Sequence, residues 1–151
     1  MIIWLEKELV LAIHDRQLAE HGGSSGVRDI TLLESALARP QQSYAYGDPL
    51  PDLAELAANL AFGLARNHPF IDGNKRTAAV CCETFIVLNH ASLEADDVEL
   101  FPLYLALAEG KLPEKDFAGW LRMHIKVHPQ NDVHEAPEKY ATQKSAGKPR
   151  K

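Results

Sequence analysis

The residues best suited to chemistry are gathered in one short stretch of the chain, HPFIDGNKRT, which spans residues 68–77. His68 is a side chain that can accept a proton near neutral pH. Asp72 offers the hard carboxylate oxygens that Mg²⁺ prefers. Two cations, Lys75 and Arg76, come directly after a Gly-Asn pair. A base, a carboxylate, a glycine and two cations at this spacing predict a site that handles phosphate.

The stretch joins two predicted helices by a short loop, so its polar groups must lie near the start of the second helix. Free backbone N–H groups and the positive end of the helix dipole attract anions there, and Gly73 allows a phosphate to approach closely. Lys75 and Arg76 are unfavourable at this end of a helix, which indicates that a negative group offsets them. We therefore expect a polyphosphate here, with Mg²⁺ bridging it to Asp72.

Each of these residues also has an ordinary structural interpretation. A histidine before a proline is usually a loop residue, and Asn-Lys-Arg is usually an N-cap followed by solvated charges. Their combination within nine positions, 68–76, favours the functional interpretation over the structural one.

Helical periodicity surrounds this loop. It predicts helices over about residues 5–21, 29–40, 51–67, 75–88, 96–109 and 113–125. Pro40 should end the second helix, His68-Pro69 the third, and Asn74 should cap the fourth. No stretch alternates as a half-buried strand does. The sequence therefore predicts an all-α bundle of about six helices over residues 1–126, with a polar, disordered tail over 127–151.

Length and composition exclude several classes of protein. The chain has 151 residues and a net charge of −5, from 16 Lys and Arg against 21 Asp and Glu. It lacks the overall basic surface of a nucleic-acid-binding protein. We expect no secretory signal and no membrane span, because its apolar runs fall short of the ~20 residues that a span needs. Adjacent Cys81 and Cys82 suit a reducing compartment, and the expected location is the cytoplasm.

The segment HPFIDGNKR resembles the signature of the Fic/Doc superfamily. Its NKR ending is similar to the Doc (death-on-curing) toxin branch, whereas typical Fic proteins carry Gly-Asn-Gly-Arg. The segment GVRDITLLESALARP and residues 110–121 are also similar to Doc chains. The resemblance covers about residues 1–125.

This resemblance implies a helical toxin of a toxin–antitoxin pair that uses ATP and Mg²⁺. Doc toxins are kinases that phosphorylate a threonine of elongation factor Tu, whereas Fic proteins transfer AMP to a target hydroxyl. Lys75 stands where Fic chains have a second glycine. Its side chain would crowd the α-phosphate site, so that ATP binds reversed with its γ-phosphate presented for transfer.

Roles for individual residues follow from the same resemblance. His68 would be the general base, Asp72 the Mg²⁺-associated carboxylate, and Phe70 an inward-facing anchor. The phosphates would be bound by Gly73, Asn74, Lys75 and Arg76.

Regulation is expected to come from a partner. No glutamate in the chain has a serine or threonine four residues before it, so the inhibitory helix of many Fic proteins is not encoded. The resemblance instead implies a Phd-like antitoxin that folds into a helical groove. Two alternatives stay open: Fic-like transfer of AMP, and a non-enzymatic module that binds a partner peptide.

Other histidines allow two interpretations. His14 and Asp15 resemble Doc chains, but a solvated face of the first helix explains them equally well. His124 and His128 have a metal-compatible spacing, and we favour surface histidines because no HExxH pattern is present.

Overall fold

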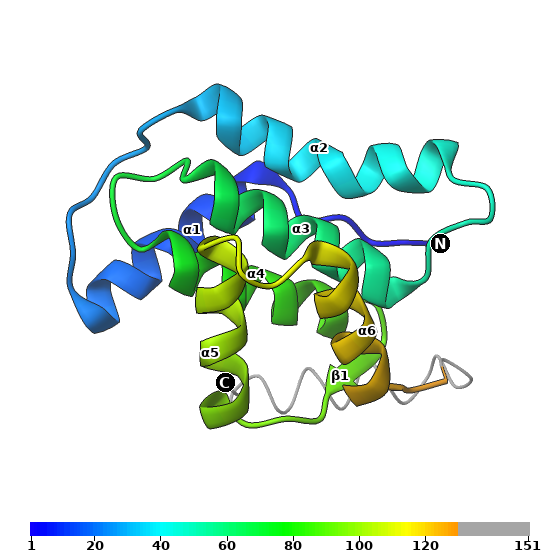
Figure 1. The fold of residues 1–151 in the computed structure, drawn as a ribbon. Helices are drawn as coiled ribbons and strands as arrows, with labels where there is room; N and C mark the ends of the chain where they lie inside the picture. Colours follow the sequence, from blue (N-terminus) through cyan, green and yellow to red (C-terminus); the bar gives the residue numbers. More distant parts are fainter. Residues whose placement is uncertain (130–151) are drawn as a thin grey trace, which may run out of the picture.

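The computed structural model describes residues 1–129. They form six α-helices and a two-stranded antiparallel sheet, which confirms the predicted all-α class (Figure 1). The elements are α1 (Lys7–His21), α2 (Ile30–Tyr46), α3 (Leu53–Asn67), α4 (Asn74–Leu88), β1 (Ala91–Leu93), α5 (Asp97–Ala108), α6 (Glu114–His124) and β2 (Ile125–Val127).

Helix α3 is the centre of the molecule, and its sequence explains why. A capping box starts it: Asp52 accepts a hydrogen bond from the Glu55 backbone N–H, and Glu55 accepts one from the Asp52 N–H, both at 2.9 Å. Alanines and leucines then cover several faces of the helix and are buried. A helix that is apolar on most sides must be enclosed, and α2, α4, α5 and α6 all pack on it.

Helix α2 lies along α3 at close range. A Cβ added to Gly63 of α3 would stand 3.1 Å from the Cβ of Ala36 of α2, so two small residues permit this approach. The two helices run side by side in Figure 1, and α2 brings its first residues to the end of α3 where α4 begins.

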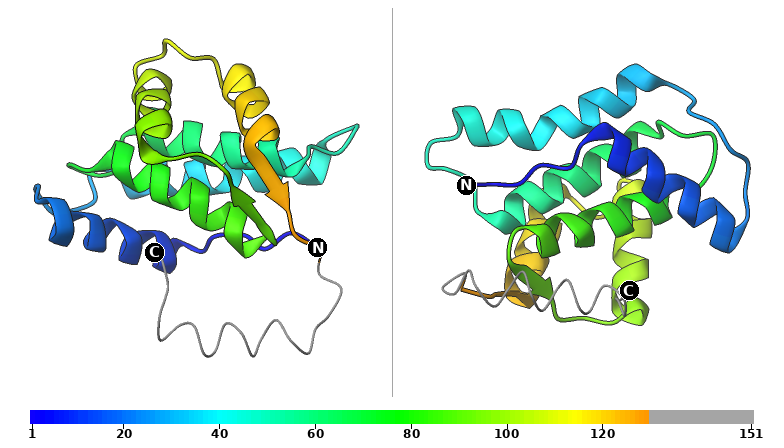
Figure 2. Two further views of the ribbon diagram at one scale, coloured as in Figure 1. Left: turned by 90° about the horizontal axis from the view of Figure 1, so that it is seen from below. Right: turned by 180° about the vertical axis from the view of Figure 1, so that it is seen from behind.

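The other helices form layers on either side of α3 and α4. Helix α1 packs on α4, and the pair α5 and α6 lies on the opposite side of the molecule (Figure 2). Strands β1 and β2 lie side by side beneath α6, with Ala91 opposite Val127 and Leu93 opposite Ile125. No helix within residues 1–129 combines the length and apolar character that crossing a bilayer requires.

Two local predictions were wrong. Pro40 does not end α2, which continues to Tyr46. The φ angle of proline suits a helix, and the buried ring of Pro40 contributes packing that offsets the lost hydrogen bond. The sequence also predicted no strands, because three-residue strands are too short for alternation to be read.

The predicted tail over residues 127–151 stays a prediction. Val127 belongs to β2, and residues 130–151 lie outside the described residues.

Candidate functional site

The candidate site is the loop between α3 and α4. Helix α3 ends at Asn67, as predicted, and His68 adopts the left-handed conformation, with φ 49° and ψ 56°. A residue before proline is disfavoured in the right-handed helical region, so the His68-Pro69 pair turns the chain out of the helix. The side chain of His68 is exposed, and no hydrogen-bond partner for its ring is found in residues 1–129.

The segment before α2 supports this loop from one side. The Arg28 guanidinium donates to the carbonyl oxygens of His68 (2.7 Å) and Asn67 (2.8 Å). The backbone N–H of Arg28 donates to Pro69 O (2.7 Å), and Ile71 N–H donates to Gly26 O (3.1 Å). The loop is therefore held as one side of a short antiparallel bridge.

Phe70 anchors the loop in the core, as the resemblance implied. Its side chain is only 1% exposed. The Asn74 side chain forms two hydrogen bonds with the backbone of Phe70. Asn74 Oδ1 accepts from Phe70 N–H, and Asn74 Nδ2 donates to Phe70 O, each at 2.9 Å. Asn74 is therefore the first residue of α4 and not its cap. The cap is Gly73, whose φ of 78° favours glycine.

Asp72 presents its carboxylate at the surface of the loop. Oδ1 accepts a hydrogen bond from Gly73 N–H (2.9 Å), and Oδ2 accepts one from Ser24 N–H (3.2 Å). The backbone at Gly23 passes so close that an added Cβ would lie 2.9 Å from Oδ2. Two backbone amides thus fix the carboxylate while leaving further lone pairs on both oxygens.

The first turn of α4 carries uncompensated positive character. Within the described part of the chain, the backbone N–H groups of Asn74, Lys75 and Arg76 meet no protein acceptor. The side chains of Lys75 and Arg76 form no ion pair with a described carboxylate. Three amides without a described acceptor, two cationic residues and the positive end of the helix dipole thus belong to one helical turn, which favours an anion.

The sequence analysis left one residue of the site with two interpretations. His14 of α1 is 2% exposed, contacts the loop through Asp72 and Phe70, and does not lie on a solvated helix face. Its spacing from the buried residues Val10 and Gln17 is the signal that could have placed it on the inward stripe of α1. Asp15, its neighbour, is exposed.

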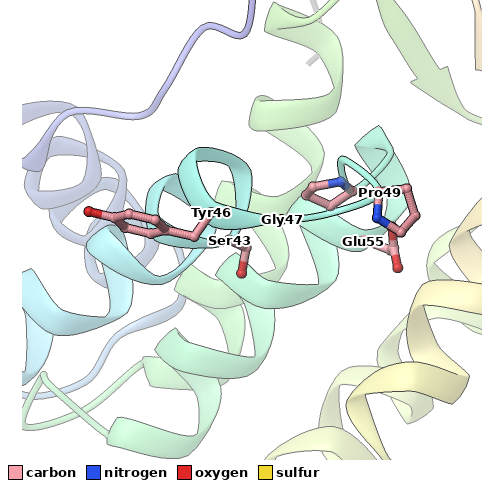
Figure 3. Close-up of a pocket in the computed structure, with 6 residues that line it drawn as sticks. Ser43, Tyr46, Gly47, Pro49 and Glu55 are labelled. Carbon is pink, nitrogen blue, oxygen red and sulfur yellow. The ribbon is translucent and has the colours of Figure 1, made fainter.

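The chain's two described cavities lie elsewhere. One, of about 380 Å³, is lined by Ser43, Tyr46 and Glu55 among others, at the start of α3 (Figure 3). The 15 residues of α3 separate it from His68, about 22 Å along the helix axis. The other, also about 380 Å³, lies between α3 and α6. Neither cavity includes a residue of the 68–77 loop.

The other candidate residues, the remaining histidines and the two cysteines, do not form a site within residues 1–129. No three His, Cys, Asp or Glu side chains within residues 1–129 converge as metal ligands. His124 is bonded to Trp120 O and His128 to Ser92 Oγ. Cys81 and Cys82 are fully buried, and burial raises the pKa of both thiols, that of Cys82 to about 12, which disfavours the thiolate that a nucleophile requires.

Comparison with known proteins identifies the family of the chain. The model of the Fic/DOC family matches residues 4–86, a range that includes both His14 and the whole 68–77 loop. The chain belongs to the Fic/DOC family. The matched range contains the 68–77 loop, helices α1 to α3, and α4 as far as residue 86.

Two relatives in this family have names that describe a function. The chain is 48% identical over 75 residues to "Toxin Doc" of Mycolicibacterium smegmatis, covering 50% of this chain and 58% of that protein. It is 32% identical over 118 residues to "Protein kinase doc" of Escherichia phage P1, covering 78% of this chain and 92% of that protein. The chain thus spans little more than half of the first relative and nearly all of the second.

Proposed function

We propose that the chain is a Doc-type toxin that transfers the γ-phosphoryl group of ATP to a serine or threonine hydroxyl of a translation factor, with elongation factor Tu as the first substrate to test. Similarity to a protein kinase over 78% of the chain supports transferase activity. Similarity to a protein named as a toxin supports growth arrest as its outcome.

The observation that carries this proposal is the start of α4. Within residues 1–129, its first three amides have no acceptor, and Lys75 and Arg76 form no ion pair. In sequence they directly follow the exposed His68 and the carboxylate of Asp72, which backbone amides hold in place. Phosphoryl transfer depends mainly on positioning and on neutralising charge. A short loop that supplies amides, cations and a carboxylate meets both needs.

The residues present fit a nucleotide with Mg²⁺. The amides of residues 74–76, with Lys75 and Arg76, would hold the phosphates. Asp72 would contribute a single carboxylate to Mg²⁺, which commonly takes one or two carboxylates and completes its shell with phosphates and water. When bound, ATP supplies the phosphoryl group. The absence of a three-ligand cluster in residues 1–129 is compatible with this mode of binding.

His68 would accept the proton of the target hydroxyl. Its ring is exposed, so a protein substrate can reach it, and the Arg28 guanidinium donates a hydrogen bond to the backbone carbonyl of His68. Positioned general bases contribute roughly 10²- to 10⁴-fold to a rate. Asn74 contributes differently from the role that the resemblance gave it: its side chain holds Phe70, and its backbone N–H is the group left for phosphate.

The decisive experiment measures which phosphate of radioactively labelled ATP is transferred to the substrate. Purified chain is incubated with elongation factor Tu, Mg²⁺ and either [γ-³²P]ATP or [α-³²P]ATP. Label from the γ-position alone supports phosphoryl transfer. Label from the α-position indicates transfer of AMP, the alternative chemistry of the family, and overturns the kinase proposal.

A matched variant separates an enzyme from a binding module. His68→Asn keeps a residue that tolerates the left-handed conformation and removes the imidazole. We expect it to lower transfer by about 10²-fold or more and to relieve growth arrest on overexpression, with unchanged thermal stability. Growth arrest that persists in His68→Asn would favour the non-enzymatic module.

We also propose inhibition in trans by an antitoxin. The name of the M. smegmatis relative supports a toxin–antitoxin setting, and no glutamate of this chain carries the serine or threonine of the inhibitory helix. If a short reading frame adjacent to the gene encodes this antitoxin, co-expression with it should restore growth. A Phd-like partner would bury an amphipathic helix on this chain.

A further inference from the structure

His14 contacts the candidate loop although 58 residues separate it from Asp72. It lies on α1, is 2% exposed, and is one of few buried polar side chains in residues 1–129. Buried polar groups are costly unless they are bonded. Its two contacts with the loop therefore indicate what the residue is for.

The first contact is a hydrogen bond from His14 Nε2 to the backbone carbonyl oxygen of Asp72, at 2.8 Å. A carbonyl oxygen can only accept, so Nε2 must carry the proton. His14 therefore donates to the peptide group that links Asp72 to Gly73.

That peptide group has a second bond on its opposite side. Its N–H, which belongs to Gly73, donates to Asp72 Oδ1 at 2.9 Å. In a trans peptide, the C=O and N–H point in opposite directions. Pinning the carbonyl toward His14 thus aims the N–H at the carboxylate of Asp72.

This peptide needs such a restraint. Gly73 has a φ of 78° and no Cβ, so rotation of the preceding peptide meets little steric resistance. A rotated peptide would withdraw its N–H from the Asp72 carboxylate. The hydrogen bond from His14 opposes that rotation.

The second contact is between rings. The imidazole of His14 stacks on Phe70 with centroids 3.8 Å apart and planes 9° from parallel. Phe70 is the residue whose backbone Asn74 grips. The loop is thus held against α1 by an apolar contact on Phe70 and a polar one on Asp72.

We propose that His14 is a positioning residue that sets the orientation of the 72–73 peptide, and through it the carboxylate of Asp72. The inference rests on the proposed function only for its effect on catalysis. The orientation of the peptide is a property of the protein without ligand and can be measured in that state.

Two substitutions separate the two contacts. His14→Phe keeps a ring for the stack and removes the donor, whereas His14→Gln places an amide N–H near the position of Nε2 and removes the ring. His21→Gln is the control, because His21 lies on the same helix, is exposed, and has Glu20 as its one ionic partner among the described residues.

The first readout is amide hydrogen exchange, resolved at Gly73, in the free protein. We expect Gly73 to exchange about tenfold faster in His14→Phe, the loss expected for one hydrogen bond. His14→Gln and His21→Gln should stay within about twofold of the parent. Interior amides of α4, such as that of Cys82, report global stability in each variant.

The second readout is the transfer assay. The KM for ATP with Mg²⁺ should rise about tenfold in His14→Phe, in proportion to the change in exchange at Gly73. His14→Gln should largely rescue it, even where loss of the stack lowers thermal stability.

The proposal is overturned if Gly73 exchange changes equally in the Phe and Gln variants and follows global stability, because His14 would then serve packing alone. It is also overturned if Gly73 exchange in His14→Phe is unchanged. If the parent protein transfers no label from ATP, the proposed function fails, while the exchange measurement still decides the role of His14.

Discussion

The guanidinium of Arg28 donates to the carbonyl oxygen of His68 across 40 residues of sequence, at 2.7 Å. A second bond, to Asn67 O at 2.8 Å, satisfies another carbonyl at the end of α3. Carbonyls in the last turn of a helix have no intrahelical donor, so a cation there is favourable. The residue proposed as the base is thus fixed through its backbone, and its ring stays exposed for a substrate.

Removing this support should impair catalysis more than stability. We expect Arg28→Ala to lower kcat by roughly tenfold, because the backbone of His68, and with it the imidazole ring, is less precisely positioned. The free energy of unfolding should fall by about 1 kcal/mol, since the bonds are exposed to water. Arg16→Ala is the control, because the one partner of Arg16 within residues 1–129 is Glu20, on the surface of α1. Equal losses in both variants, measured by transfer assay and urea unfolding, would contradict the role given to Arg28.

The glycines before Ser24 provide a matched pair. Gly22 and Gly23 both have positive φ angles, 83° and 124°, so an alanine is strained at either position. Only at Gly23 would the new Cβ meet the Asp72 carboxylate, 2.9 Å from Oδ2. We expect Gly23→Ala to reduce phosphate transfer by roughly tenfold or more relative to Gly22→Ala. Similar activity in the two variants would show that the position of Asp72 tolerates displacement.

The grip of Asn74 on Phe70 should matter for folding. Asn74→Ala leaves a donor and an acceptor of the buried Phe70 backbone without partners. Each unsatisfied buried group costs about 1–3 kcal/mol, so we expect a loss of roughly 3 kcal/mol in the free energy of unfolding. Urea denaturation measures it. A loss under about 1 kcal/mol would mean that water replaces the amide in the variant.

The ion pair between Asp52 and Arg122 predicts a pH dependence of stability. The hydrogen bond from Arg122 lowers the pKa of Asp52 from its ordinary value of 3.8, although partial burial opposes the shift. A carboxyl whose folded pKa is depressed stabilises the fold above its unfolded pKa, and this contribution is lost as pH falls through the folded pKa.

Asp52→Asn keeps an N-cap acceptor and removes the charge. Near pH 7 it should be less stable than the parent by under about 1 kcal/mol, because the pair is half exposed. The difference in the free energy of unfolding between parent and variant should disappear below pH 3.8, as measured by unfolding at a series of pH values. A gap that widens on acidification would contradict the assignment.

Much of the fold was accessible from the sequence because its determinants are local. The turn at His68-Pro69 acts within a few residues, and the end of α3 at Asn67 followed from it. The start was predicted near residue 51 and lies at Leu53, after a capping box of Asp52 and Glu55 that is equally local. The prediction that Pro40 ends α2 was wrong, because the free-energy cost of a proline inside a helix depends on whether its ring is buried. Burial is a property of the tertiary structure. The prediction that Asn74 caps α4 was wrong, because its side chain forms hydrogen bonds with the buried backbone of Phe70 instead.

The sequence by itself determined the contiguous part of the candidate site, from His68 to Arg76, because loop residues at a helix start must lie together whatever the rest of the chain does. Only the tertiary structure decided that His14, Ser24 and Arg28 support this loop. Their partners lie 58, 48 and 40 residues away, at Asp72 and His68. No local pattern encodes such contacts, since they arise when α1 packs on α4 and the α1–α2 connection lies along the loop.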